Sequence, residues 1–310
     1  FRLDATLYSR ETEDLIQQVS TSRASGFTAR SLNAGTISNK GVELGLDITP
    51  LVSTESFSWD MRLNWSKNVN EVVSLAEGIE NLPVADDNTP PFGPQIVARE
   101  GEELGTFYGT GFATNDEGER IVTPNAFATY RATSSNEVLG SYRPDWTGSA
   151  STTFSYNNLS LRVLVDGQKG GQIWSLSNLF GLYSGMFQET VEGNQRRLGV
   201  MPEGANSAEI SPRSMYQGLF GLHEAHLYDA SYIKLREATI SYRLPQKWLA
   251  DLPLRQFNVS VAARNLATLL KYTPNFDPTA VTRDAGNLQG IEAGQMPPKR
   301  TFGLRLRATF

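Results

Sequence analysis

Two histidines three positions apart form the segment whose residue types come nearest to a metal or acid/base site. The segment is His223-Glu224-Ala225-His226. Zinc proteases place two histidines four positions apart on one helical face, with a glutamate directly after the first. Here the spacing is three, no third ligand is indicated, and the segment leads from a loop into a strand. We therefore predict solvated loop histidines and expect neither a metal nor another cofactor.

Acidic clusters and closely spaced glycines also invite a chemical interpretation. The acidic clusters at 86–87 and 116–119 are rich in oxygen ligands, but neither has the spacing of a calcium-binding EF-hand loop. Gly105, Gly109 and Gly111 lack the spacing of a dinucleotide-binding fingerprint, and no helix is expected after them. No nucleophile–base pair or carboxylate pair can be argued. We therefore predict that the protein is not an enzyme.

The composition excludes several further classes of protein. The chain has 310 residues, of which 39% are hydrophobic and 20% charged, and its formal net charge is −5. It contains no cysteine, which excludes disulfides and thiol chemistry. No cluster of lysine or arginine supports binding of nucleic acid. No stretch approaches the roughly 18 apolar residues of a membrane-spanning helix. The mean hydropathy of −0.33 is still compatible with a membrane β-barrel, because barrel strands alternate apolar and polar residues.

The dominant pattern in the sequence is a period of two. Apolar residues alternate with polar ones in the segments 1–8, 42–48, 57–65, 159–166, 257–263 and 302–310. Such segments have one apolar and one polar face when they form strands. A soluble β-sandwich would also alternate, but these runs reach about 9–11 residues, the length of a tilted strand that crosses a bilayer. A lysine or arginine that faces lipid costs about 2–4 kcal/mol, which explains why the apolar positions carry no charge.

The lengths of the connections support the same architecture. Eight strands are predicted at about 1–10, 39–49, 57–67, 145–156, 159–168, 231–244, 256–265 and 300–310. Long connections at about 11–38, 68–144, 169–230 and 266–299 alternate with short turns, as in barrels with extended extracellular loops and tight periplasmic turns. The segments 94–110 and 118–131 are expected to add one strand pair, and a bulge is expected near Arg236. We therefore predict an all-β fold, an antiparallel transmembrane β-barrel with about 8–10 strands in this chain.

Seven short segments, in order along the chain, carry a resemblance to a known family. They are Asn39–Leu44 (NKGVEL), Gly101–Gly109 (GEELGTFYG), Arg143–Gly148 (RPDWTG), Gly170–Gly171, Ala230–Arg236 (ASYIKLR), Ala263–Leu266 (ARNL) and Pro297–Phe302 (PPKRTF). Together they resemble the C-terminal barrel portion of SusC/RagA-type TonB-dependent outer-membrane transporters. The resemblance implies that residues 1–310 are part of a larger 22-strand plugged barrel. The plug and the segment that contacts TonB would then lie outside this chain.

The resemblance also implies a function. The expected activity is TonB-dependent import of a bulky nutrient, an oligosaccharide, glycan or peptide, across the outer membrane. The expected partners are a SusD-like surface lipoprotein, the TonB complex, the barrel-assembly machinery and the lipid bilayer, and the C-terminus is expected to be periplasmic. Two alternatives remain open from the residues alone. One is a passive porin or an adhesin-type barrel, and the other is a soluble glycan-binding β-sandwich.

Three groups of residues are candidates for specific roles. Aromatic residues of the connection 169–230 are predicted to contact substrate, although they could equally pack the loop on itself or against the lipoprotein; they are Trp174, Phe180, Tyr183, Phe187, Tyr216 and Phe220. Aromatic residues near strand ends are predicted to form girdles at the bilayer interfaces, rather than packing a core; they are Trp59, Trp65, Trp146, Tyr156 and Tyr242. The last strand resembles the signal read by the barrel-assembly machinery, through Phe302, Leu304, Leu306 and Phe310.

Overall fold

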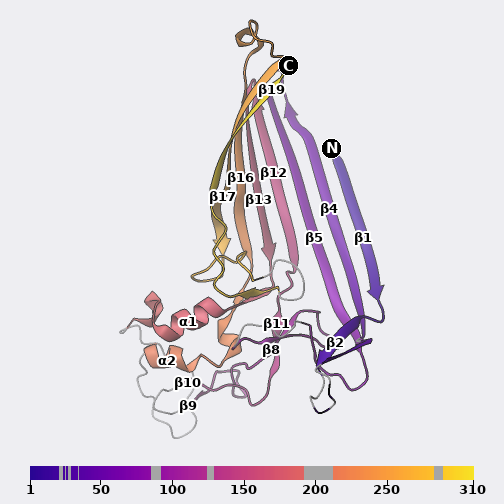
Figure 1. The fold of residues 1–310 in the computed structure, drawn as a ribbon, viewed down its shortest axis with the longest axis vertical. Coiled ribbons are helices and arrows are strands. Elements are labelled where there is room, and N and C mark those ends of the chain that lie inside the picture. Colours follow the sequence, from indigo (N-terminus) through magenta and orange to yellow (C-terminus); the bar gives the residue numbers. More distant parts are fainter. Residues whose placement is uncertain are drawn as a thin grey trace.

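Eight long strands form one antiparallel sheet, which we call the wall (Figure 1). The computed structural model describes residues 1–310 except 21–23, 25, 27–28, 34, 85–91, 124–128, 192–211 and 283–288. The wall strands, in their order across the sheet, are β1 (Arg2–Thr12), β4 (Gly35–Ser53), β5 (Phe57–Leu75), β12 (Trp146–Tyr156), β13 (Leu159–Lys169), β16 (Tyr232–Arg243), β17 (Gln256–Lys271) and β19 (Thr301–Thr309). This order is also their order in the sequence, so the wall is a meander. All eight predicted strands are confirmed.

The strand register gives the wall two different faces. One row of paired residues is apolar from β5 to β19 and consists of Trp59, Phe154, Leu161, Ile240, Val261 and Leu304. The adjacent row lies on the other face and consists of Ser58, Ser155, Ser160, Ser241, Ser260 and Arg305. Because successive side chains of a strand point to opposite sides, this alternation separates an apolar face from a polar face across six strands.

One irregularity of the wall was predicted correctly and one was not. Glu237 pairs with Leu164 and Leu235 pairs with Val165, so Arg236 is the extra residue of a bulge, as expected. The additional wall strands expected at 94–110 and 118–131 are wrong. Residues there form shorter strands, two to four residues long, which are too short to cross a bilayer. The described side chains of β7 and β8 are mostly buried, and the described part of the wall has eight strands.

The long connections gather at one end of the wall and form what we call the loop layer, which comprises the described parts of 76–145, 170–231 and 272–300 (Figure 1). Its principal elements are β6 (Leu82–Pro83), β7 (Gln95–Ala98), β8 (Thr106–Gly109), β9 (Val122–Thr123), β10 (Thr129–Tyr130), β11 (Glu137–Ser141), β14 (Gln172–Ser175), α1 (Leu176–Ser184), η2 (Gln188–Thr190), α2 (Pro212–Gly218), η3 (His223–His226), β15 (Leu227–Asp229) and β18 (Ile291–Glu292). A separate hairpin joins β2 (Ile16–Ser20) to β3 (Ala29–Asn33).

The opposite end of the wall has tight turns. β4 and β5 are separated by three residues, and β12 and β13 by Asn157 and Asn158. Asn157 has a φ of 51°, the left-handed conformation that asparagine tolerates. The longest connection at this end contains η4 (Gln246–Trp248) between β16 and β17. The predicted alternation of long and short connections is therefore present. Among the described residues, no helix has the length and apolar character needed to span a bilayer.

The loop layer has a conventional apolar core. One cluster of buried side chains is built around Phe107, Trp174, Leu179 and Ile291, and a second cluster includes Leu182 and Met215. Helix α1 contributes to both, through Leu179 and Leu182. The described apolar side chains that are nearly fully buried lie almost entirely in this layer and in the adjoining ends of β4 and β5.

Tyr142 is the point at which several loops of this layer meet. A Cβ on Gly105 would lie 2.4 Å from the Tyr142 ring, and one on Gly290 would lie 2.3 Å from the Tyr142 Cβ. Both glycines have positive φ, of 106° and 78°, so they are required by backbone conformation as well as by space. The Tyr142 ring also packs edge-on against Phe107. Glycines of two remote segments thus allow the loops to close around one side chain.

A buried ion pair ties the loop layer to the wall. The ammonium of Lys234 on β16 donates to both carboxylate oxygens of Asp277 and, at 2.6 Å, to the Thr279 hydroxyl. The Lys234 side chain is only 7% exposed. Burial opposes ionisation of Asp277, but the hydrogen bonds from Lys234 and Thr279 outweigh that effect and hold the pKa of Asp277 below its usual range. The connection 272–300 is therefore anchored where it leaves the wall.

Candidate functional site

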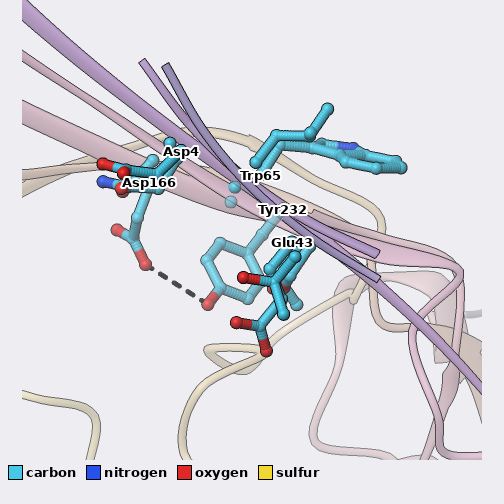
Figure 2. A pocket seen from close by; sticks show the side chains of 14 residues that line it. Asp4, Glu43, Trp65, Asp166 and Tyr232 are labelled. Carbon is cyan, nitrogen blue, oxygen red and sulfur yellow. Dashed lines mark hydrogen bonds between the residues drawn. The ribbon is translucent and has the colours of Figure 1, made fainter. Parts of the chain in front are cut away.

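The polar face of the wall contains a hollow of about 540 Å³ near the loop layer. Carboxylates from three different strands line it, namely Asp4, Glu43 and Asp166, together with Tyr232. Figure 2 shows Glu43, Asp166 and Tyr232 on one side of the strands and Trp65 on the other side. The Tyr232 hydroxyl lies 3.4 Å from Asp166 Oδ2 (Figure 2). The alternation of the strands thus places the acidic groups together and excludes Trp65 from them.

Ion pairs neutralise part of this polar face. Arg236, the bulged residue, donates to Asp166 at 2.5 Å, and Arg264 donates to Glu237 at 2.8 Å. Arg62 pairs with Asp47 on the neighbouring strands β5 and β4. The face therefore presents paired charges and hydroxyl groups. Such a surface can form hydrogen bonds with a solute. Among the described residues that line the hollow, we find no nucleophile paired with a general base.

The two histidines make separate hydrogen bonds in the loop layer. His223 Nδ1 accepts a hydrogen bond from the Thr110 amide at 3.0 Å, and burial lowers the pKa of His223. His226 is 1% exposed, so the prediction of solvated histidines is wrong for this residue. Its Nε2 donates to the Leu219 carbonyl at 3.1 Å, and burial lowers the pKa of His226 to about 4. No group of three or more potential metal ligands occurs among the described residues.

The structure separates the six loop aromatics into two groups. Trp174 is fully buried, Tyr216 is 7% exposed, and Phe187 packs against Gly181 of α1. These three side chains stabilise the layer from within. Phe180 and Tyr183 are each 43% exposed and contact Phe220, with ring centroids 5.9 and 5.0 Å from it. Substrate contact stays a prediction for all six residues, and accessibility favours the second group.

Phe92 was missed by the sequence analysis and joins the exposed group. Its ring lies 5.0 Å from Phe220 and 6.2 Å from Phe180, and it is 52% exposed. Phe92 is far from α1 in the sequence and belongs to no alternating segment. No local signal could have placed it beside Phe180 before the fold was known.

The proposed girdle residues lie toward the two ends of the wall. At the turn end of the wall, Leu159 pairs with Tyr156 on one side and with Tyr242 on the other. Trp59 lies two positions along β5 from Phe57, the residue that pairs with Tyr156. Trp146 lies at the other end of β12, opposite Lys169. Tyr156 lies ten positions after Trp146 on β12, about 33 Å along the strand. A tilt of about 40° reduces that to roughly 25 Å, the height of the apolar band of outer-membrane barrels. Assignment as girdles stays a prediction.

The residues of the proposed assembly signal lie on β19 and just beyond it. Phe302, Leu304 and Leu306 are 74%, 68% and 59% exposed and share the apolar face with Val259 and Val261 of β17. Phe310 follows the strand and is 75% exposed. Their recognition by the assembly machinery is likewise a prediction.

Comparison with known proteins relates this wall and loop layer to one group of receptors. No family model matches the chain. TonB-dependent receptor P3 of Formosa agariphila is 26% identical over 328 residues, which cover 98% of this chain and 32% of that receptor. TonB-dependent receptor SusC of Bacteroides thetaiotaomicron is 35% identical over 72 residues, or 23% of this chain and 7% of SusC. A structure of the RagAB peptide transporter superimposes with a TM-score of 0.70 at 21% identity, covering 99% of this chain and 33% of that one.

The chain is therefore similar to TonB-dependent receptors of the SusC/RagA type. It spans about a third of the length of the curated relatives that it matches over nearly its full extent, each covered to 32%. The RagAB importer in its closed-closed state superimposes with a TM-score of 0.71 at 22% identity and is covered to 34%. The wall and the loop layer therefore correspond to part of a receptor of this type, and the antiparallel fold predicted from the alternation is confirmed.

Proposed function

We propose that the protein takes part in active import of a bulky nutrient across the outer membrane. The observation that carries the proposal is the match of nearly the whole chain, wall and loop layer together, to TonB-dependent receptors. The two-faced wall supports it, since an apolar face meets lipid and a polar face lines a water-filled interior. The polar face contributes hydrogen-bonding groups and paired charges, so the proposed activity is transport without catalysis.

The arrangement of the connections supports an orientation. Outer-membrane barrels have short periplasmic turns and long extracellular loops. The loop layer would then lie at the extracellular mouth, and the turns, the chain end at Phe310 and η4 would be periplasmic. Energy would come from the TonB complex, which acts on parts of the receptor outside the described wall. A SusD-like surface lipoprotein would bind at the mouth, as the two-component RagAB importer suggests.

The substrate class is an oligosaccharide, a glycan or a peptide. Uptake of two fluorescent probes, a mixed oligopeptide pool and a mixed oligosaccharide pool, should be measured in cells that carry the intact receptor. We expect accumulation of one pool that disappears when tonB is deleted or the proton gradient is collapsed. Accumulation that is unchanged without TonB would show a passive pore and refute the proposal.

The membrane location has its own test. The intact receptor should require detergent for extraction, sediment with outer membranes, and migrate faster on SDS gels before boiling than after. Recovery of the folded receptor in the soluble fraction would exclude the transmembrane barrel, whatever the uptake assay shows.

A further inference from the structure

Two exposed lysines lie on the apolar face of the wall, close to the loop layer. On the neighbouring strands β4 and β5, Val42 pairs with Lys67, and Lys40 pairs with Val69. Lys67 is two positions from Trp65, which Figure 2 shows on the side of the strands away from the carboxylates. Residues two apart on a strand point to the same side, so Lys67 and Lys40 share the face of Trp65 and Val42. The apolar face therefore gains positive charge at this end.

The lysines lie at the level of the predicted aromatic girdle. Ser66 pairs with Thr147, so the adjoining positions on the two strands, Lys67 and Trp146, fall in one row. A lysine that faces lipid is costly at the middle of the bilayer and costs little near its boundaries. A bilayer boundary that runs through the row of Trp146 therefore tolerates both lysines, and it places their ammonium groups among lipid headgroups.

The two charges have no carboxylate partner within the described part of the chain. The ion pairs there involve other residues, including Lys169 at the same end of the face, which lies 3.7 Å from Asp229. Glu11 and Glu71 of the same face lie one row farther toward the loops and pair with neither lysine. Lys40 and Lys67 occupy diagonal positions of the ladder, about 7–8 Å apart at this spacing. An anion between them would relieve the repulsion of two like charges.

A hollow of about 510 Å³ is lined by both lysines, and we call it the lysine hollow. Its other lining side chains on this face are Leu7, Val42 and Val69, together with Ser9. Leu7 is 79% exposed and Val69 is 50% exposed, so apolar surface is open beside the charges. The lysine hollow therefore combines two cations with an apolar channel, a combination that suits an amphiphile with an anionic head.

On the opposite side of the same strands, the floor of the hollow is fixed. The Tyr8 ring lies against Gly41, where a Cβ would come within 2.3 Å of it. The Tyr8 hydroxyl donates to Asn68 at 3.0 Å. These contacts hold β1, β4 and β5 together from the polar face. A floor that is already ordered loses little conformational entropy when a ligand binds.

The place of the hollow in the sheet leaves its outer side to the bilayer. The two lysine-bearing strands, β4 and β5, each have two hydrogen-bonded neighbours in this chain, so no further strand can be inserted beside them. A strand from elsewhere in the receptor could add only beyond β1 at this edge. An apolar cover would leave the charges of Lys40 and Lys67 buried without a partner, which is costly. A lipid with an anionic head supplies both an apolar cover and the missing charge.

We propose that the lysine hollow binds a phosphorylated lipid of the membrane leaflet nearer the loop layer. Lysine binds phosphate as a point charge, and the phosphate accepts hydrogen bonds from the ammonium groups of Lys40 and Lys67. An acyl chain lies along Leu7, Val42 and Val69, where each buried CH₂ adds to the affinity. The inference rests on the membrane location in the proposed function and is independent of what is imported. The site lies on the opposite face of the wall from the hollow lined by Asp166.

The test compares the lysine hollow with an exposed lysine at the other end of the wall. The intact receptor in an uncharged detergent is titrated with fluorescent phosphatidic acid. Lys40→Gln and Lys67→Gln should each weaken binding about fivefold, and the double variant about 25-fold, because each removes one cation from the phosphate. Lys247→Gln on η4 removes the same charge at the turn end and should leave binding unchanged. Lys40→Arg and Lys67→Arg retain the charge and should bind within about twofold of the wild type.

The apolar part of the site has its own variant. Val69→Trp fills the hollow without changing charge and should weaken binding of phosphatidic acid several-fold. Two competitors separate the parts of the ligand. Dioleoylglycerol has the chains without the phosphate, and inorganic phosphate has no chain, so each should displace the fluorescent lipid at least tenfold less well than unlabelled phosphatidic acid.

Three outcomes would overturn the proposal. Equal binding by the wild type and the double glutamine variant would show that the lysines only extend into water. Equal competition by inorganic phosphate would show a site for a free anion. Unchanged lipid binding with an altered oligomeric state would show a contact between copies of the receptor. Heat-modifiable migration confirms that each variant is folded. If uptake proves independent of TonB, active import fails while this inference stands, because detergent extraction tests the membrane location separately.

Discussion

The wall exposes its apolar residues, whereas the loop layer buries them. In the wall, apolar side chains such as Leu304 remain exposed and the polar face holds ion pairs. In the loop layer, Trp174, Phe107 and Ile291 are fully buried, as in a water-soluble domain. The difference is the one expected if the apolar face of the wall meets lipid and the loop layer lies in water. Each region should therefore respond to a substitution that the other tolerates.

The largest expected effect is on the core of the loop layer. Trp174→Ala removes a fully buried side chain and should destabilise this layer by about 3–5 kcal/mol. Limited proteolysis should then cut the loop layer of the intact receptor, while its heat-modifiable migration stays normal. The control is Met296→Ala, at an exposed position. It should change the stability of the loop layer by less than about 0.5 kcal/mol and leave its resistance to proteolysis unchanged. If Trp174→Ala instead abolishes the folded band on gels as well as the protease resistance of the loop layer, the wall and the loop layer fold as one unit.

The next effect belongs to the wall. Val163 lies on the apolar face, paired with Thr152 and Ala238, near the middle of the strands. Val163→Arg should cost about 2–4 kcal/mol if this face meets lipid. The control is Ser149→Arg, which places the same side chain on the polar face opposite Asp166. Urea titration of the folded band measures both variants, and equal stability of the two would contradict a lipid-facing surface.

The wall could be predicted from the sequence because its information is local. Alternation within each strand sets the two faces, and turn residues such as Asn157 mark the hairpins. The bulge at Arg236 could be predicted for the same reason, since the alternation shifts phase there. The two extra strands were predicted wrongly because short buried strands in a compact layer can show the same apolar content without crossing a bilayer.

The loop layer could not be predicted because its contacts join remote segments. The Trp174 amide donates to the Gly290 carbonyl at 2.8 Å, and β14 pairs in parallel with β18. The requirement for glycine at positions 105 and 290 arises only in the folded layer, where both residues contact Tyr142. The aromatic composition of 169–230 indicated a packed or binding loop. It could not separate the buried Trp174 from the exposed Phe180, because neither residue belongs to a periodic pattern that defines a face.

The smallest expected effect uses pH to loosen the loop layer alone. The pKa of His226 falls from 6.5 to about 4 on folding, first because burial disfavours the charged ring. The Leu219 carbonyl opposes this shift and the neighbouring His223 adds to it. In the neutral ring Nδ1 carries no proton and has no partner among the described groups, so protonation would bury an unpaired N–H.

The direction of the pH effect on stability depends on whether the folded or the unfolded layer binds the proton. Above pH 6.5 the neutral ring contributes its full stabilisation; between pH 6.5 and 4 the unfolded layer takes up a proton that the folded layer excludes. Stability of the loop layer should therefore fall by about 2 kcal/mol from pH 7 to pH 5. Hydrogen exchange should show faster opening of η3 and α2, with wall strands unchanged. His226→Gln should flatten this pH dependence, and a slope that persists in the variant would assign it to other groups.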